Sequence, residues 1–210
     1  MDDTGVYFMM EYIKGDELWN LLYSEFDKPP TPLQEPMVQF YAAGLVSILI
    51  HLHKQRIVYR DLKPENVMIN STNGYPKLID FGFAKQIGTR TWTLCGTPYY
   101  LSPEILSCIG HDTSCDWWAL GILLYEVFFG CTPFQGDSVF NTYTNILSHQ
   151  FVFPAEPHPS KISTSAIEFI TGLLQQEKKQ RIGGYVKDEV GGERSVYFHT
   201  YIVILAAFNV

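Results

Sequence analysis

The sequence predicts an α+β fold that is mainly α-helical and carries a few short strands. Apolar residues make up 46% of the 210 residues, and the mean hydropathy is −0.01. This composition is sufficient for a buried core and excludes a disordered chain. Residues 116–129 are apolar on nearly all sides, which is typical of a helix in the middle of a core. Strand-like runs are short and the sequence has no internal repeat, so we expect one helical domain with little sheet.

The N-terminal part of the chain is expected to hold one strand and one short helix. Residues 6–12 are largely apolar and bounded by turn residues, which predicts a short buried strand. Leucines at 18, 21 and 22 share one face of a short helix, and the prolines at 29, 30 and 32 terminate it.

Longer helices are predicted by the remaining apolar stripes. The stripe over residues 38–52 belongs to a helix that starts close to Pro36, because proline is tolerated in the first turn. The alternative start at the Thr31-x-x-Gln34 capping box would leave this proline in the helix interior, so we reject it. Residues 140–149 predict a further helix, and the capping box Ser165-x-x-Glu168 predicts the start of the last one.

The middle of the chain combines short strands with a long loop. Residues 57–58 and 67–69 are strand candidates on either side of a polar loop. Asn73-Gly74 predicts a turn before a third strand at 77–79. Residues 82–104 show no sustained period, and a loop of that length in a compact domain is usually functional.

Charge and cysteine content exclude several classes of protein. Fifteen basic and twenty-two acidic residues give a net charge of −7 and a pI near 5.3, which disfavours nucleic acid as a partner. The four cysteines have no ligand-like spacing with the six histidines, which disfavours a zinc site or a disulfide framework and favours a reduced, cytoplasmic setting. The N-terminus has no basic leader region, and we expect no membrane span.

The polar loop carries the most informative chemistry in the sequence. It reads Tyr59-Arg-Asp-Leu-Lys-Pro-Glu-Asn66, and Asp80-Phe-Gly82 begins nineteen residues after Asp61. Asn66 and Asp80 offer the hard oxygen atoms that Mg²⁺ prefers. Asp61 is placed to accept a hydroxyl proton, and Lys63 to balance charge on a migrating phosphoryl group. One such residue alone would be a solvated loop residue or a helix cap, but the ordered set indicates phosphoryl transfer.

This pair of motifs resembles the catalytic loop and the Asp-Phe-Gly element of the eukaryotic protein kinases. The resemblance covers about residues 5 to 187 and implies a kinase large lobe (C-lobe) with the hinge and one small-lobe strand. It implies Asp61 as the catalytic base, Lys63 as a contact to the γ-phosphate of ATP, and Asn66 and Asp80 as the residues that hold Mg²⁺. Tyr59 replaces the usual histidine, as in the cyclic-nucleotide-dependent kinases of the AGC group.

Residues 86–104 resemble the activation segment of the same kinases. Thr93 matches their activating phosphosite, and a phosphate there would pair with Arg60. The alternative for Thr93 is a solvent-exposed loop hydroxyl. Thr97 matches the threonine that hydrogen-bonds the catalytic Asp and Lys, which favours serine and threonine substrates.

The resemblance also implies nucleotide and substrate contacts. The Glu11 carbonyl and the Ile13 N–H would bind adenine, with Met68 beneath the ring, although a methionine is more often plain core. Three acids would bind arginines upstream of the target hydroxyl, and three apolar residues would receive the residue after it. The acids are Glu17, Glu65 and Glu126, and the apolar residues are Leu94, Pro98 and Leu101.

Some of these positions have a second interpretation, and others are structural. For Glu126, which lies in the apolar helix, the alternative is a structural salt bridge. Asp116 matches a residue that braces the catalytic loop, and Arg181 matches one that pairs with Glu104.

Several features depart from the family pattern. The sequence has no G-x-G-x-x-G loop and no lysine ahead of the hinge. We therefore expect residues 1–12 to be a remnant of the small lobe with the hinge, 13–190 the large lobe, and 191–210 an atypical tail. Phosphoryl transfer by this chain alone should be weak. The alternative function is a non-catalytic module that binds basic segments or a partner kinase.

Placement within the group is a finer prediction. Residues 15–19, 110–112 and 142–147 favour the cyclic-GMP-dependent kinases. A regulatory cyclic-nucleotide-binding domain would lie outside this chain. Tyr99 replaces a glutamate of the cyclic-AMP-dependent enzymes, which puts one distant arginine contact in doubt.

Overall fold

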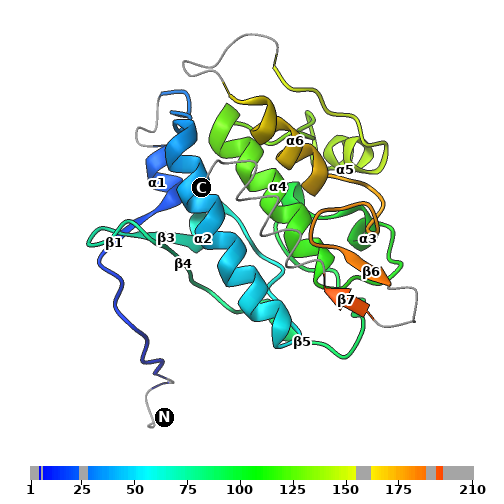
Figure 1. The fold of residues 1–210 in the computed structure, drawn as a ribbon, viewed down its shortest axis with the longest axis horizontal. Helices are drawn as coiled ribbons and strands as arrows, with labels where there is room; N and C mark the ends of the chain where they lie inside the picture. Colours follow the sequence, from blue (N-terminus) through cyan, green and yellow to red (C-terminus); the bar gives the residue numbers. More distant parts are fainter. Residues whose placement is uncertain (1–4, 6, 24–27, 155–161, 188–192, 196–210) are drawn as a thin grey trace.

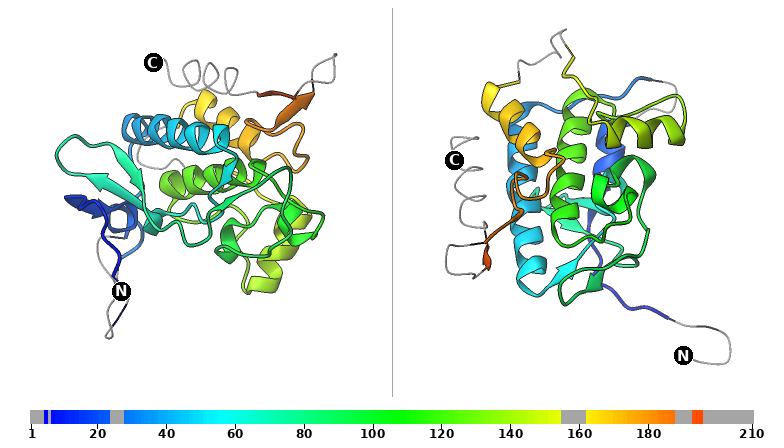
Figure 2. Two further views of the ribbon diagram at one scale, coloured as in Figure 1. Left: turned by 90° about the horizontal axis from the view of Figure 1, so that it is seen from below. Right: turned by 90° about the vertical axis from the view of Figure 1, so that its right-hand side faces the viewer.

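The computed structural model describes residues 5, 7–23, 28–154, 162–187 and 193–195 (Figure 1). Its core is built around α4 (Ser114–Phe129), which contacts α2 (Glu35–Lys54) and α6 (Thr164–Leu173). Figure 1 and the turned views of Figure 2 show α2 and α4 running side by side. The other helices are short: α1 (Leu18–Leu22), η1 (Pro64–Asn66), η2 (Pro98–Tyr100), α3 (Pro103–Leu106) and α5 (Val139–Leu147).

The helix over residues 116–129 is confirmed, and it is buried along its length. Every residue from Ser114 to Phe128 is buried, including the side chains of Trp117 and Trp118. Gly130 ends the helix in the left-handed conformation (φ 72°), which glycine adopts without steric cost. The prediction of a central core helix followed from its apolar residues on all sides, and its place between α2 and α6 agrees.

The start of α2 is also as predicted. Gln34 is the N-cap and Pro36 lies in the first turn, so the competing capping box at Thr31 is not used. Among the described residues, α2 is the one helix long and apolar enough, by length and composition, to cross a membrane. Its apolar residues have another explanation in this fold, because one face of α2 packs on α4 and β4 (Pro76–Leu78).

The sheets are small and antiparallel. One has the order β1-β3-β4, formed by β1 (Gly15–Glu17), β3 (Val67–Asn70) and β4. Val67 lies opposite Leu78, so the start of β3 adjoins the end of β4. Two further pairs complete the sheets: β2 (Ile57–Val58) with β5 (Lys85–Gln86), and β6 (Tyr185–Lys187) with β7 (Glu193–Ser195).

Two local predictions were wrong. Residues 7–12 form no strand in the described chain, and Phe8, Met9 and Met10 each expose more than 80% of their surface. A strand needs a neighbouring strand and a packing layer, and no described element supplies either to these three side chains. The last helix is capped by Ser163, whose Oγ accepts from the backbone N–H of Ala166 at 3.1 Å, and not by Ser165.

The predicted long loop contains more structure than expected. Residues 82–104 include β5, η2 and the start of α3, linked by irregular segments. The predicted atypical tail at 191–210 falls largely outside the described residues.

Candidate active site

Asp61 lies in the loop between β2 and η1, where three neighbouring side chains surround its buried carboxylate. Oδ1 accepts a hydrogen bond from the Thr97 hydroxyl at 2.9 Å. Oδ2 accepts from Asn66 Nδ2 at 2.8 Å and lies 3.1 Å from Lys63 Nζ, which also donates to Thr97 at 3.1 Å. The structure thus brings Asp61, Lys63, Asn66 and Thr97 together.

Asp116, at the start of α4, fixes the backbone of this loop. Its fully buried carboxylate accepts from Tyr59 N at 2.9 Å and from Arg60 N at 2.8 Å. His53, near the end of α2, lies 2.7 Å from the same carboxylate. Arg60 is held at φ 69°, which is unfavourable for a residue with a side chain, so these bonds support a strained turn.

The pairing of β3 with β4 brings the segments that carry Asn66 and Asp80 together. Because β3 begins where β4 ends, Asn66 lies beside Ile79, whose N–H donates to the Asn66 carbonyl at 3.0 Å. Asp80 comes next in the chain, is exposed and has φ 54°, and its Oδ1 accepts from Gly82 N at 2.9 Å. The Tyr59 hydroxyl donates to the Ile79 carbonyl at 2.5 Å, which ties the catalytic loop to the segment leading to Asp80.

Asn66 and Asp80 suit a divalent cation shared with phosphate. The Asn66 side-chain nitrogen, Nδ2, donates one hydrogen bond to the backbone carbonyl of Asp61 and one to its Oδ2. The side-chain amide oxygen of Asn66 is therefore the atom left for a ligand. In the part of the chain that the structure describes, no group of three or more His, Cys, Asp or Glu side chains is arranged to hold a metal ion. Any ion at this place would need oxygen atoms from its ligand, as Mg²⁺ bound to phosphates has.

Glu126 is a buried carboxylate held by neutral donors. Tyr23 donates to Oε1 at 2.7 Å and Tyr100 donates to Oε2. Burial raises the pKa of Glu126; the bonds from Tyr100 and Tyr23 oppose this, and the Glu65 carboxylate adds to it. The alternative interpretation, a structural salt bridge, is not formed with any described residue. Tyr23 and Tyr100 are partners that the sequence analysis did not identify.

Glu17 and Glu65, the other two acids predicted to bind substrate arginines, lie on elements that contact one another. Glu17 ends β1 and pairs in register with Met68 on β3. Glu65 lies in η1, which contacts β1 and α1. Glu17, Glu65 and Glu126 therefore belong to one region beside the catalytic loop, although they come from three separate elements.

The activation segment is held at Thr91 and exposed at Thr93. Thr91 forms a two-bond bridge with His111, with both N···O distances 2.9 Å, and its hydroxyl accepts from Lys85 Nζ at 3.0 Å. Arg60 donates through Nε to the Phe83 carbonyl at 2.7 Å. Its Nη1 is buried and has no hydrogen-bond partner among the described residues. A cationic donor near the segment is thus left unused.

The predicted contacts to adenine lie on an irregular segment. Residues 11–14 have no regular structure, and Glu11 forms an exposed ion pair with Lys77 of β4. Ile13 and Met68 are both half-buried.

The apolar residues predicted to receive the residue after the target hydroxyl differ in their burial. Leu94 is 62% exposed, whereas Leu101 is buried against Ile105 and Cys115. Thr97 and Leu101 line a small pocket beside Arg60, and Pro98 is half-buried.

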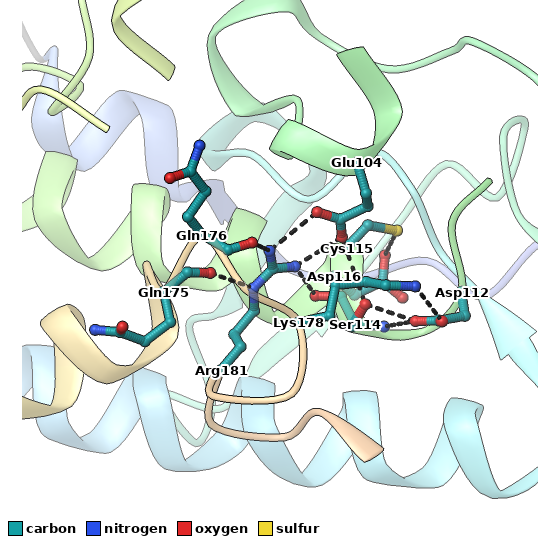
Figure 3. A network of polar contacts seen from close by, with 9 residues as sticks. All are labelled: Glu104, Asp112, Ser114, Cys115, Asp116, Gln175, Gln176, Lys178 and Arg181. Atoms are coloured by element: carbon teal, nitrogen blue, oxygen red, sulfur yellow. Dashed lines mark hydrogen bonds and ion pairs between the residues drawn. The ribbon is translucent and has the colours of Figure 1, made fainter. Parts of the chain in front are cut away.

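The predicted pair of Arg181 with Glu104 is formed and buried (Figure 3). Arg181 Nη1 and Nη2 donate to the two carboxylate oxygens of Glu104 at 2.7 and 3.0 Å. Arg181 also donates to the carbonyls of Ser114, Gln175 and Gln176, and it lies over the Trp118 ring. Although burial alone would raise the pKa of Glu104, these bonds from Arg181 lower it below its ordinary value.

The helical lobe brings Asp61, Lys63 and Asn66 together, as the resemblance to the protein kinases implies. Comparison with known proteins agrees: the protein kinase domain family matches residues 1–190. The chain belongs to this family of enzymes.

Curated relatives narrow the group. The chain is 41% identical to a cAMP-dependent protein kinase, catalytic subunit-like, of Caenorhabditis briggsae, over 87% of this chain and 44% of that protein. It is 43% identical to cAMP-dependent protein kinase catalytic subunit 3 of Drosophila melanogaster, over 87% and 29%. It is 40% identical to the human cAMP-dependent protein kinase catalytic subunit PRKX, over 87% and 48%. The chain thus spans less than half the length of these relatives.

Proposed function

We propose that this chain is the large lobe of a serine/threonine protein kinase that transfers the γ-phosphoryl group of ATP to hydroxyls in basic protein segments. The observation that carries the proposal is the buried Asp61 carboxylate, held by Thr97, Asn66 and Lys63. A carboxylate fixed at both oxygens and next to a lysine is suited to orient and deprotonate an alcohol.

The hydrogen bonds indicate which oxygen would take the proton. Oδ2 of Asp61 already accepts from Asn66 and lies against Lys63, whereas Oδ1 accepts from Thr97 alone among the described contacts. Oδ1 therefore keeps a lone pair for the substrate hydroxyl. Lys63 donates to Thr97 and its side chain remains 22% exposed, so its ammonium is accessible to balance charge on a phosphoryl group.

Asn66 and Asp80 would hold Mg²⁺ through their side-chain oxygens. When bound, this ion neutralises charge on the phosphates of ATP. The Glu11 carbonyl and the Ile13 N–H would hold adenine over Met68. We also propose that the protein acts in the cytoplasm and is of the cyclic-GMP-dependent subtype. A regulatory cyclic-nucleotide-binding domain would lie outside this chain.

Thr93 is the proposed activating phosphosite. Its side chain is exposed, so a kinase could reach it. The buried Arg60 Nη1 without a described partner supports the proposal, since a phosphate would supply the missing acceptor.

Substrate arginines are proposed to bind Glu17, Glu65 and Glu126, and Glu126 gives this binding a pH dependence. The raised pKa of Glu126 means that it takes up a proton at a higher pH than an ordinary glutamate. We expect the affinity for a fluorescent Arg-Arg-Ala-Ser peptide to fall by roughly three- to tenfold between pH 7.5 and 5.5. Fluorescence anisotropy measures it, and Glu126→Gln should bind weakly with a flatter pH profile. An identical profile in the variant would contradict the assignment.

The experiment that tests the function supplies the elements that the sequence does not contain. A protein-kinase small lobe that carries a glycine-rich loop and the strand lysine would be joined ahead of the hinge. We expect this fusion to phosphorylate an arginine-rich peptide, with residues 1–210 alone at least about 100-fold slower, because positioning of the phosphates contributes much of the rate. Transfer of ³²P from labelled ATP measures both. An inactive fusion that folds would contradict the proposal.

The second candidate is a binding module without phosphoryl transfer. Its support is the Glu126 carboxylate, which has two tyrosine donors and no cationic partner among the described residues. If arginine-rich peptides bind the chain equally with and without Mg·ATP, and the fusion moves no phosphate, this candidate is favoured.

A further inference from the structure

An ion pair joins the loop after α6 to the turn before α4 (Figure 3). Lys178 Nζ lies 2.8 Å from Oδ2 of Asp112, and the two side chains are 22% and 13% exposed. The other oxygen, Oδ1, accepts from the backbone N–H and the hydroxyl of Ser114 at 3.0 and 2.5 Å. The carboxylate is thus fixed on one side by the first turn of α4 and on the other by Lys178.

The contacts of Asp112 favour its charged form. Burial alone would raise the pKa of this carboxyl group, but the bonds from Lys178 and Ser114 bring it below the ordinary value. The Asp112 carboxyl group is therefore ionised at neutral pH.

Lys178 is held firmly enough to act as an anchor. Glu177 O accepts from the N–H groups of Gln180 and Arg181, and Arg181 O accepts from Gly184 N, so the loop is a closed turn. A Cβ atom at Gly184 would lie 2.1 Å from the Lys178 carbonyl oxygen. The backbone of Lys178 is therefore packed directly against this glycine.

Asp112 in turn adjoins the residue that holds the activation segment. His111, next to it in the chain, makes both backbone bonds to Thr91 at 2.9 Å. Thr91 is 3% exposed and lies two residues before Thr93. A shift of the 110–113 turn would therefore move the bridge to Thr91.

We propose that Lys178 is a positioning residue for the activation segment, acting through Asp112 and the bridge between His111 and Thr91. The relevance to phosphoryl transfer rests on the proposed kinase function. Arg181 has a different role, because it bonds Glu104 and three backbone carbonyls but not Asp112. Among the described ion pairs, Lys178 is the cation that holds this carboxylate.

The test is hydrogen exchange of the Thr91 and His111 amides, resolved by NMR on the full 210-residue chain. Lys178→Met removes the charge and keeps the length, and we expect both amides to exchange about tenfold faster, while amides in the middle of α2 stay within twofold. Lys178→Arg should restore protection. The matched control is Lys179→Met, at the exposed neighbour in the same loop, and it should leave all of these rates unchanged.

Each outcome decides the inference. Unchanged exchange at Thr91 and His111 in Lys178→Met would overturn it. Faster exchange that is equal in α2 would also overturn it, since the pair would then support the fold in general. The readout needs no catalysis, so an inactive small-lobe fusion would refute the proposed kinase function and leave this inference to be judged by exchange alone.

Discussion

In the fusion of this lobe with a protein-kinase small lobe, Asp61→Asn should lower kcat by about 10²–10⁴-fold. Asparagine keeps the shape of aspartate and can still accept from Thr97, but it cannot take a proton from the substrate hydroxyl. Its amide would also face Asn66 Nδ2 and Lys63 Nζ, which are donors in the native arrangement. Single-turnover transfer of ³²P to an arginine-rich peptide measures the loss.

Peptide affinity should change little in the same variant, because Asp61 is not among the acids proposed to bind arginine. The matched control is Asp137→Asn, at an exposed acid in the loop before α5, which should transfer phosphate at the native rate. A variant at Asp61 that keeps more than about a tenth of the native kcat would remove this residue from the role of base.

The parts of the fold that could be predicted are those specified by local sequence. Helix α4 is apolar on nearly all sides, and such a helix has few stable places outside a core. The start of α2 followed from the position of Pro36, whose ring is compatible with the first turn alone. The catalytic loop was predictable because its residues are contiguous and ordered.

The errors arose where a distant part of the chain decides between local alternatives. Ser163 and Ser165 are both able to cap α6. Ser163 is the residue that also bonds Glu35, 128 residues earlier, through its N–H at 2.9 Å and its hydroxyl at 2.5 Å. This distant contact favours Ser163 as the cap. The apolar run at 6–12 has the composition of a strand, but composition does not specify a partner strand.

Single polar contacts over long separations were also beyond sequence reasoning. Tyr23 reaches Glu126 across 103 positions, and Lys178 reaches Asp112 across 66. Each contact joins only two residues, so neither produces a repeating pattern in the sequence. The pair of Arg181 with Glu104 was expected because it forms part of a family pattern, and the same reasoning gave no role to Lys178.

The pair of Arg181 with Glu104 leads to the largest expected change in stability. Arg181→Met should lower the free energy of unfolding at pH 7 by about 3–5 kcal/mol, because it leaves the Glu104 carboxylate buried without its partner. The three carbonyls that accept from Arg181 lose their donor as well. Urea unfolding, followed by tryptophan fluorescence, measures the change through the midpoint at constant m.

The pH dependence separates this cause from a simple loss of packing. In the native protein the pKa of Glu104 is lowered, so the pair stabilises the fold above the ordinary carboxyl range and loses that contribution as the pH falls through the lowered pKa. In Arg181→Met the pKa of Glu104 should instead rise, because burial is no longer opposed, and the carboxyl group becomes neutral on mild acidification. The stability difference between the two proteins should therefore shrink from pH 7 to pH 5.

A double variant completes the test and serves if Arg181→Met does not fold at pH 7. Glu104→Gln with Arg181→Met removes the buried charge, so it should be more stable at pH 7 than Arg181→Met alone, with a smaller dependence on pH. It should remain below the native protein, since the carbonyls of Ser114, Gln175 and Gln176 still lack their donor. Equal losses in the single and double variants at both pH values would show that packing of the arginine stem, and not its charge on Glu104, stabilises this part of the lobe.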